Sequence, residues 1–507
     1  MRYISMKKII LGMLTAVLIC CAGILMSCAT DNGNNKSDSS SSDTKRDRAR
    51  YTVIIYGNAG GRMDYIIERM WGNLKPMLND QANVRVFVLY KYGKGTEDQL
   101  FTGQYGNQSD VMMFELNSKT DLNQLKNTEN NSAFKLTVNS PEFELYDSKS
   151  LAAYITAVKE YAPADNYIFT LWGHGGGYDI LNDRPDNMVV SRGVLYDETL
   201  EGKGMNMYQF SDALATCNTH FQLIMFHNCL MGNIETLTEV QPYADYFFAS
   251  SHLLSSFGQP IEIMIEKLIK SSDYNFENTA KEMFVDLKKT YNETQGIPPE
   301  IMEEMKNDMP EGMTEPKRNY DFKIIRSADL TNLNNNISFF VSRLLELYQD
   351  LSNDEVKMKK VMTDCAYAYE VQDYAYLIDL KKYIQTVAAA INDTVLSAHA
   401  KNVIDCIDNS IIQRWDYSVV SQLKEFSLSV MLPYHDFLHY ETKNNYTVAE
   451  SYYPSSFNRR TGWALWMDAN RYFPTKWMFD TELPMGSPED ADIDWDMLKV
   501  DILDKKK

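Results

Sequence analysis

The sequence predicts an α/β protein in which helices flank a mostly parallel sheet, with a helix-rich C-terminal region after it. From residue 51 onward, apolar segments of strand length alternate with segments of helical spacing, which is the order that builds a parallel sheet. Two of the apolar segments, 167–172 and 223–226, are followed closely by reactive side chains, His174 and Cys229. With 507 residues, of which 44% are hydrophobic, the chain is long enough for two or more packed domains.

Residues 1–28 have the features of an export signal. Lys7 and Lys8 precede the apolar stretch 9–26, which is short for a membrane span. The sequence Leu25-Met26-Ser27-Cys28 then resembles a bacterial lipobox, in which the cysteine carries lipid after cleavage. This resemblance implies a lipid anchor at Cys28 and a place in the cell envelope, at the outer membrane or surface of a Gram-negative bacterium. A plain secretory signal with a chance cysteine is the alternative interpretation.

Residues 29–50 differ in composition from everything that follows. They are rich in Asn, Ser and Asp and contain almost no apolar residue, so they cannot bury enough surface to fold. We interpret them as a disordered tether. The folded part then divides into residues 51–270, which carry both reactive side chains, and residues 271–507, a helix-rich region expected to pack on the first.

Regular elements can be assigned in order along residues 51–270. Strands are predicted at 52–56, 84–90, 111–114, 167–172 and 221–226, and helices at 63–77, 148–161 and 211–215. Beyond Cys229, the spacing of Leu230, Ile234, Leu237 and Val240 predicts a further helix that begins just after the thiol. The N-terminus of a helix in that place would favour the thiolate.

The two reactive side chains are expected to meet at one edge of the sheet. The carboxyl ends of parallel strands share an edge, and ligands and catalytic groups collect in the crevice outside it. An imidazole at His174 and a thiol at Cys229 would form a base and a nucleophile there, so the pattern predicts a cysteine peptidase. The simpler interpretations are a buried apolar cysteine and a histidine satisfied within a turn.

The region after residue 270 contains one unusual segment and several helical patterns. Residues 294–318 are rich in Pro and Met among acids, and we interpret them as a surface insertion or, alternatively, as a lid over the cleft. Helices are predicted at 337–351 and 376–396, and residues 427–432 are a candidate additional strand of the main sheet.

Several segments together resemble the clostripain-type cysteine peptidases, a family with the caspase-like fold. The similarity covers most of the chain from residue 51, and the order and spacing of its segments argue against chance. The matching segments are residues 163–167 leading into 171–177, Tyr196-Asp197, residues 228–232 with Glu235 downstream, and residues 327–330, 378–380 and 427–433.

The resemblance implies a role for each matching residue. His174 would be the catalytic base and Cys229 the nucleophile, working as a dyad through a thioester intermediate. The backbone NH groups of Gly175 and Cys229 would form the oxyanion hole. Family members are often made as zymogens and cut between the histidine and the cysteine, so any maturation cut is expected within residues 179–207.

One part of the family pattern is changed in this chain. Family members commonly have an acid two positions before the cysteine, where this chain has His227, and the usual Ser-Glu-Glu reads Ser250-Ser251-His252. A neutral imidazole does not compensate a buried guanidinium. We therefore expect a substrate pocket with His227, Ser250 and Ser251 that prefers a neutral or acidic P1 side chain. Alternatively, His227 simply hydrogen-bonds a backbone carbonyl.

Charge and cysteine content limit the partners and the redox chemistry. The formal charge of −19 becomes −22 when the three basic residues of the export signal are removed, which excludes nucleic acid as a natural partner. We expect a monomer that acts on peptides or proteins and meets the membrane through its lipid. The seven cysteines show no zinc-binding spacing, and Cys365 and Cys406 can pair or stay free.

No cofactor and no metal site is predicted. His435 and His439 have the i, i+4 spacing of metal ligands on a helix, but a preceding proline opposes a helix there. Asp490, Asp492 and Asp494 alternate as in a calcium loop, but a tryptophan stands where the turn glycine belongs. Calcium is implied by the family resemblance alone.

Two other functions remain open from the sequence. A catalytically inert surface-binding lipoprotein that keeps the caspase-like fold is permitted by the change at His227, although such a protein would have no need of both His174 and Cys229. A hydrolase of amides other than peptides would use the same dyad and oxyanion hole.

Overall fold

The computed structural model describes most of the chain beyond the N-terminal segment. The described residues are 48–58, 62–79, 83–91, 111–121, 145–178, 193–196, 204–254, 261–272, 275–294, 320–351, short pieces between 353 and 371, 374–417, 425–432 and 455–467. The predicted signal with Cys28 and most of the tether lie outside them, as do most of 179–207 and 294–318. His435, His439 and the three aspartates from 490 to 494 also lie outside them.

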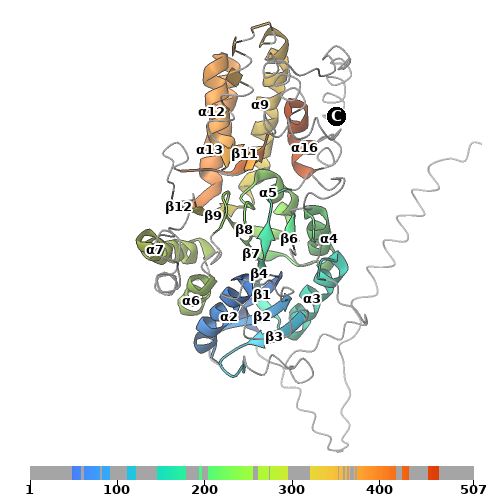
Figure 1. The fold of residues 1–507 in the computed structure, drawn as a ribbon, viewed down its shortest axis with the longest axis vertical. Coiled ribbons are helices and arrows are strands. Elements are labelled where there is room, and N and C mark those ends of the chain that lie inside the picture. Colours follow the sequence, from blue (N-terminus) through green and yellow to red (C-terminus); the bar gives the residue numbers. More distant parts are fainter. Residues whose placement is uncertain are drawn as a thin grey trace, which may run out of the picture. The chain divides into compact units, whose positions relative to one another are not determined.

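An eight-stranded sheet forms the centre of the described fold, in the order β12-β9-β8-β7-β4-β1-β2-β3 (Figure 1). Its strands are β1 (Ala49–Asn58), β2 (Val84–Lys91), β3 (Val111–Leu116), β4 (Ala164–Trp172), β7 (Phe221–His227), β8 (Ala244–Ala249), β9 (Tyr320–Arg326) and β12 (Ile411–Tyr417). Strands β2, β1, β4, β7 and β8 run parallel to one another, whereas β3 pairs antiparallel with β2, β9 with β8, and β12 with β9. The predicted α/β class with a mostly parallel sheet is confirmed, and each predicted strand up to residue 226 lies within an observed one.

Apolar side chains pack on both faces of this sheet. On β1, Ile54 and Tyr56 belong to one buried cluster and Val53 and Ile55 to the other, because successive side chains of a strand point to opposite faces. Burial on both faces explains why the central strands are continuous apolar runs rather than alternating ones. Figure 1 shows α2 and α3 on opposite sides of β1 and β2.

The helices divide between the two clusters. The first cluster includes residues of α3 (Ser148–Tyr161), α4 (Met207–Cys217), α5 (Ile234–Val240), α9 (Asp329–Leu351), α12 (Leu380–Ile391), α13 (Thr394–Ser410) and α16 (Ser456–Thr461). The second includes residues of α2 (Arg62–Leu74), α6 (Ile261–Lys270) and α7 (Phe276–Thr294). Short 3-10 helices, η1 (Lys75–Met77) and η3 (Gln241–Tyr243), follow α2 and α5. No helix of the described part is long and apolar enough to span a bilayer.

The predicted helix over 376–396 is wrong in its boundaries. Residues up to Asp379 form strand β11 (Tyr374–Asp379), and α12 begins only at Leu380, because the Asp379 carboxylate accepts a hydrogen bond from the Lys382 amide at 3.0 Å and caps the helix. Asn392 then adopts a left-handed conformation and ends α12, and Asp393 caps α13. The periodicity of apolar residues cannot by itself show where such caps begin and end a helix.

The candidate strand at 427–432 exists but does not join the main sheet. Strand β13 (Ser429–Met431) pairs antiparallel with β11 in a three-stranded sheet that also contains β10 (Glu370–Val371). Asp379 holds it there, since its carboxylate accepts hydrogen bonds from the Ser427 amide at 2.8 Å and the Ser427 hydroxyl at 2.6 Å. The region after residue 270 instead contributes β9 and β12 to the central sheet.

Candidate active site

The two segments predicted to carry the chemistry leave adjacent parallel strands at the same edge of the sheet. The last residue of β4, Trp172, is paired with the last residue of β7, His227. His174 therefore follows β4 by two residues, in the short strand β5 (His174–Gly175), which pairs with β6 (Val194–Tyr196). Cys229 follows β7 by two residues in a turn. The side chains of His174 and Cys229 are both partly exposed, so a substrate can reach this edge.

The two loops beyond these strands are locked together. The Asn228 side-chain amide donates to the carbonyl oxygens of Gly173 at 3.0 Å and His174 at 3.1 Å. Gly175 lies against Cys229 so closely that a Cβ atom there would stand 2.5 Å from the Cys229 carbonyl oxygen and 3.1 Å from its amide nitrogen. Only glycine permits this approach. The structure thus brings His174, Gly175 and Cys229 into one site.

The sulfur of Cys229 has a backbone donor beside it. The amide of Leu254 lies 3.2 Å from the Cys229 Sγ atom in donor geometry. A hydrogen bond from an amide favours a negatively charged acceptor. This donor comes from the segment after β8, not from the helix that follows the cysteine.

The predicted helix start immediately after Cys229 is wrong. Leu230 adopts a left-handed backbone conformation with φ of 65°, and α5 begins only at Ile234, where the Asn233 side chain accepts from the Thr236 amide. A left-handed residue cannot continue a helix, so the chain turns before α5 starts. The residues that suggested a helix from 230 onward are buried for another reason, because Leu230 and Met231 belong to the core.

His227 is buried at the foot of this site and does not open onto solvent. Its side chain is 2% exposed, and its ring stacks on the Trp172 indole with 3.5 Å between ring centroids and 14° between planes. The position two residues before the cysteine therefore holds an imidazole packed flat against an aromatic ring. No carboxylate is contributed from this position.

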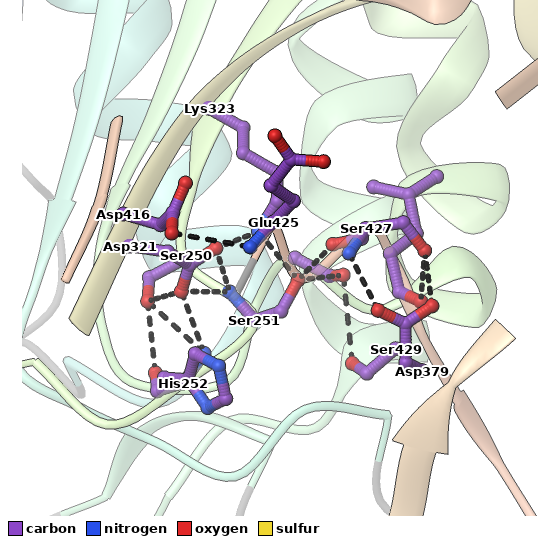
Figure 2. A network of polar contacts seen from close by, with 12 residues as sticks. Ser250, Ser251, His252, Asp321, Lys323, Asp379, Asp416, Glu425, Ser427 and Ser429 are labelled. Carbon is purple, nitrogen blue, oxygen red and sulfur yellow. Dashed lines mark hydrogen bonds and ion pairs between the residues drawn. The ribbon is translucent and has the colours of Figure 1, made fainter. Parts of the chain in front are cut away.

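Ser250 and Ser251 are also buried, and their hydroxyl groups are used inside the protein (Figure 2). The Ser250 hydroxyl donates to the Asp321 carboxylate at 2.7 Å, and the Ser251 hydroxyl donates to the Gly232 carbonyl at 2.9 Å. The two serines predicted to line a substrate pocket therefore tie the turn after β8 to strand β9, through Ser250, and to the loop that carries the cysteine, through Ser251.

Three further buried residues lie beside these serines, and sequence reasoning missed two of them, Asp321 and Lys323. His252 is 2% exposed, and burial, with the nearby charge of Lys323, lowers the pKa of His252 well below 6.5. Asp321 and Lys323 lie on β9 and are buried in contact with each other. The signal that could have revealed them is two opposite charges in the apolar run 320–326, which is unusual for a buried strand.

Other features of the described residues lie apart from this site. A cavity of about 680 Å³ opens beside His220, Asp245 and Arg326, near the beginning of β7 and thus at the other end of that strand. Cys365 and Cys406 are free, so the disulfide that the sequence allowed is not formed. No cluster of metal-binding side chains occurs among the residues that the structure describes.

Comparison with known proteins agrees with the resemblance noted in the sequence. A model of the clostripain family matches residues 65–480. A secreted C11 cysteine protease from Bacteroides thetaiotaomicron is similar in structure, with 11% identity, a TM-score of 0.49 and coverage of 82% of this chain and 99% of that one. An inactive zymogen C11 protease from Parabacteroides distasonis is similar with 14% identity, a TM-score of 0.47 and coverage of 82% and 98%. None of the curated proteins matches the chain.

Proposed function

Because the chain belongs to the clostripain family of cysteine peptidases, we propose that it is an endopeptidase in which Cys229 is the nucleophile and His174 the general base. The observation that carries the proposal is the close contact of residues 173–175 with Asn228 and Cys229 at one edge of the sheet. The Asn228 amide donates to the carbonyls of Gly173 and His174, and Gly175 packs against Cys229. It puts a partly exposed thiol and a partly exposed imidazole on adjoining loops.

The geometry supports acyl transfer in two steps. The Cys229 thiolate attacks the scissile carbonyl carbon, and the negative charge that develops on the carbonyl oxygen is stabilised by the amides of Gly175 and Cys229. His174, which has taken the proton of the Cys229 thiol, gives that proton to the leaving amine, which departs and leaves a thioester on Cys229. A water molecule that gives its proton to His174 then hydrolyses the thioester, and the thiolate is restored.

We propose further that the P1 preference is for a neutral or acidic side chain. The support is that neither position where family members commonly carry an acid supplies a carboxylate in this chain, since they hold His227 and the sequence Ser250-Ser251-His252. His227 is stacked on Trp172, and the neighbouring acid, Asp321, is paired with Lys323 and accepts hydrogen bonds from the turn at Ser250. A guanidinium brought there would lack a counter-charge and lose several kcal/mol. A peptide-library profile dominated by Arg or Lys at P1 would contradict this.

The catalytic assignment is tested with acyloxymethyl-ketone probes that carry different P1 residues, applied to the chain from Ala29 onward, followed by peptide mass mapping. We expect covalent labelling at Cys229 that is lost in Cys229→Ala and strongly slowed in His174→Ala. Cys217 supplies a matched control, because it is buried and burial raises its pKa, so Cys217→Ala should label like the wild type. Absence of labelling at Cys229 would favour an inert binding lipoprotein.

Lipid attachment, maturation and calcium dependence belong to the same proposal. We expect Cys28 to carry lipid, and a maturation cut to fall within residues 179–207. Metabolic labelling with a fatty acid, compared between wild type and Cys28→Ala, tests the anchor. Terminal sequencing of the mature fragments tests the cut, and a junction outside 179–207 would contradict it. Activity with and without a calcium chelator tests the ion.

A further inference from the structure

Strand β9 carries two opposite charges into the protein interior. Asp321 and Lys323 are two residues apart, so their side chains leave the strand on the same face, and they are 0% and 1% exposed. The Asp321 carboxylate contacts the Lys323 ammonium directly. Burial lowers the pKa of Lys323 to about 7, although the carboxylates of Asp379 and Asp416 oppose this shift. A buried ion pair adds little net stability over apolar residues, so its presence calls for another explanation.

The Asp321 carboxylate binds the turn that follows β8. It accepts hydrogen bonds from the Ser250 hydroxyl at 2.7 Å, the Ser251 amide at 3.0 Å and the His252 amide at 3.0 Å (Figure 2). Three donors from three consecutive residues on one buried carboxylate fix the conformation of that turn. A carboxylate can accept this many hydrogen bonds because its two oxygens carry about four lone-pair positions.

The same turn binds the loop that carries Cys229. The Gly232 amide donates to the Ser250 carbonyl at 2.6 Å, and the Ser251 hydroxyl donates to the Gly232 carbonyl at 2.9 Å. The Leu230 amide donates to the His252 carbonyl at 3.1 Å. The turn therefore holds the residues after the cysteine at two positions.

The contact continues to the sulfur itself. Two residues beyond His252, the Leu254 amide lies 3.2 Å from the Cys229 Sγ atom. The segment 250–254 is thus connected to Asp321 at one end and to the reactive sulfur at the other. A displacement of its first residues moves the donor at its last residue.

The cysteine loop needs such support because its backbone is not in a relaxed conformation. Leu230, directly after the cysteine, has φ of 65°, which is unfavourable for a residue with a side chain and persists only where the surroundings enforce it. At Gly232 a Cβ atom would stand 2.6 Å from the Ser251 hydroxyl oxygen and 2.7 Å from the Ser251 amide nitrogen. The loop therefore fits only against a turn placed as this one is.

We propose that Asp321 is a positioning residue for Cys229, acting through the turn 250–254, and that Lys323 serves as its buried counter-charge. The inference rests on the proposed function, in which Cys229 is the nucleophile. Neither Asp321 nor Lys323 touches the substrate. Asp321 sets the place of the Leu254 amide and of the strained residue after the nucleophile, and Lys323 allows a carboxylate to remain charged in the interior.

The test is Asp321→Asn in the full chain, assayed for peptide hydrolysis and for the rate of Cys229 alkylation by iodoacetamide as a function of pH. We expect kcat to fall about 100-fold, as for a displacement of about 1 Å in reacting groups, with KM within about twofold. The midpoint of the alkylation profile should move to higher pH, because the amide donor to the sulfur is displaced. A purely structural role would lower the folded fraction and leave that midpoint unchanged.

Two further variants keep the proposal falsifiable when the single change destabilises the protein. D321N/K323M removes both charges together, so it should recover thermal stability without recovering kcat. Ser250→Ala leaves the ion pair intact and removes one link of the turn to Asp321, and it should lower kcat about tenfold with the same direction of shift in the alkylation profile. Recovery of kcat in the double variant, or wild-type kcat in Ser250→Ala, would overturn the proposal.

A matched control is the ion pair of Arg85 with Glu115, which is also largely buried but joins β2 to β3 away from the site. Glu115→Gln should lower stability and leave the alkylation midpoint in place. The variant Cys229→Ala distinguishes a failure of the proposed function from a failure of the proposed role of Asp321. Retained activity in that variant refutes the proposed function, whereas loss of activity there with wild-type behaviour of Asp321→Asn refutes only the role of Asp321.

Discussion

Replacing Gly175 with alanine is expected to lower peptidase activity because it pushes the histidine loop away from the cysteine loop. The added Cβ atom would lie 2.5 Å from the Cys229 carbonyl oxygen and 2.7 Å from the Asn228 Cβ atom. Both are atoms on or next to the backbone, so neither can rotate away. The two loops must separate.

The size of that separation can be worked out from the contact. Ordinary van der Waals contact of a Cβ atom begins at 3.4 Å, so the 2.5 Å contact requires a displacement of about 0.9 Å. A displacement of about 1 Å between reacting groups costs on the order of 100-fold in rate, which is about 2.7 kcal/mol of transition-state stabilisation. We expect kcat/KM of Gly175→Ala to fall by about that factor, mainly through kcat.

The assay is steady-state hydrolysis of a peptide substrate, with thermal unfolding of the same preparations. Gly72→Ala is the matched control, because a Cβ atom at Gly72 in α2 would meet nothing within 4 Å. That change replaces glycine by a better helix former and should raise stability by up to about 1 kcal/mol without altering kcat/KM. If Gly175→Ala retains activity within about twofold of the wild type, the close approach of the two loops has no bearing on catalysis and the reasoning fails.

Two further predictions concern buried polar groups near the site. Burial lowers the pKa of His252 well below 6.5, so the unfolded chain takes up a proton there below pH 6.5 that the folded chain does not. The stability contributed by neutral His252 is therefore complete above pH 6.5, and below that pH it falls by up to about 1.4 kcal/mol per pH unit. Between pH 7 and pH 5, the melting temperature of His252→Gln should therefore drop less than that of the wild type. An equal drop in the variant would contradict the lowered pKa of His252. Asn228→Ala removes the donors to the carbonyls of Gly173 and His174. It should lower the free energy of unfolding, measured in urea, by about 1–3 kcal/mol. It should also lower kcat, which a surface substitution with the same loss of stability would not do.

The central strands and the two reactive positions could be predicted because their signals are local. Residues buried on both faces of a parallel strand form a short apolar run, and a run that ends beside a histidine or a cysteine indicates where that side chain emerges. The pairing of Trp172 with His227 in the sheet makes His174 and Cys229 neighbours, as the order of the segments implied. Nothing beyond strand length and chain order was needed for that result.

The interruptions of helices and the sheet membership of short strands could not be predicted in the same way. Leu380 is apolar and fits the helical spacing of its neighbours on both sides, yet the cap formed by Asp379 starts the helix there. The left-handed backbone of Leu230 is decided by contacts with the segment after β8, and a leucine carries no local preference for it. Such features depend on residues far away in the chain.

The geometry around the cysteine depends on residues from both sides of residue 270. Asp321 reaches the turn after β8 from β9, the Ser429 amide donates to the Gly232 carbonyl at 3.0 Å, and the Met431 amide donates to the Glu235 carboxylate at 2.9 Å. The loop and helix after Cys229 are therefore held by strands that lie about 90 and about 200 residues further along the chain. The Asp321 carboxylate is buried beside the cysteine loop, and it is already occupied by Lys323 and by the turn after β8. The proposed role of Asp321 is therefore to hold the cysteine loop, and a carboxylate committed to Lys323 and the turn has no part in binding a basic side chain of the substrate.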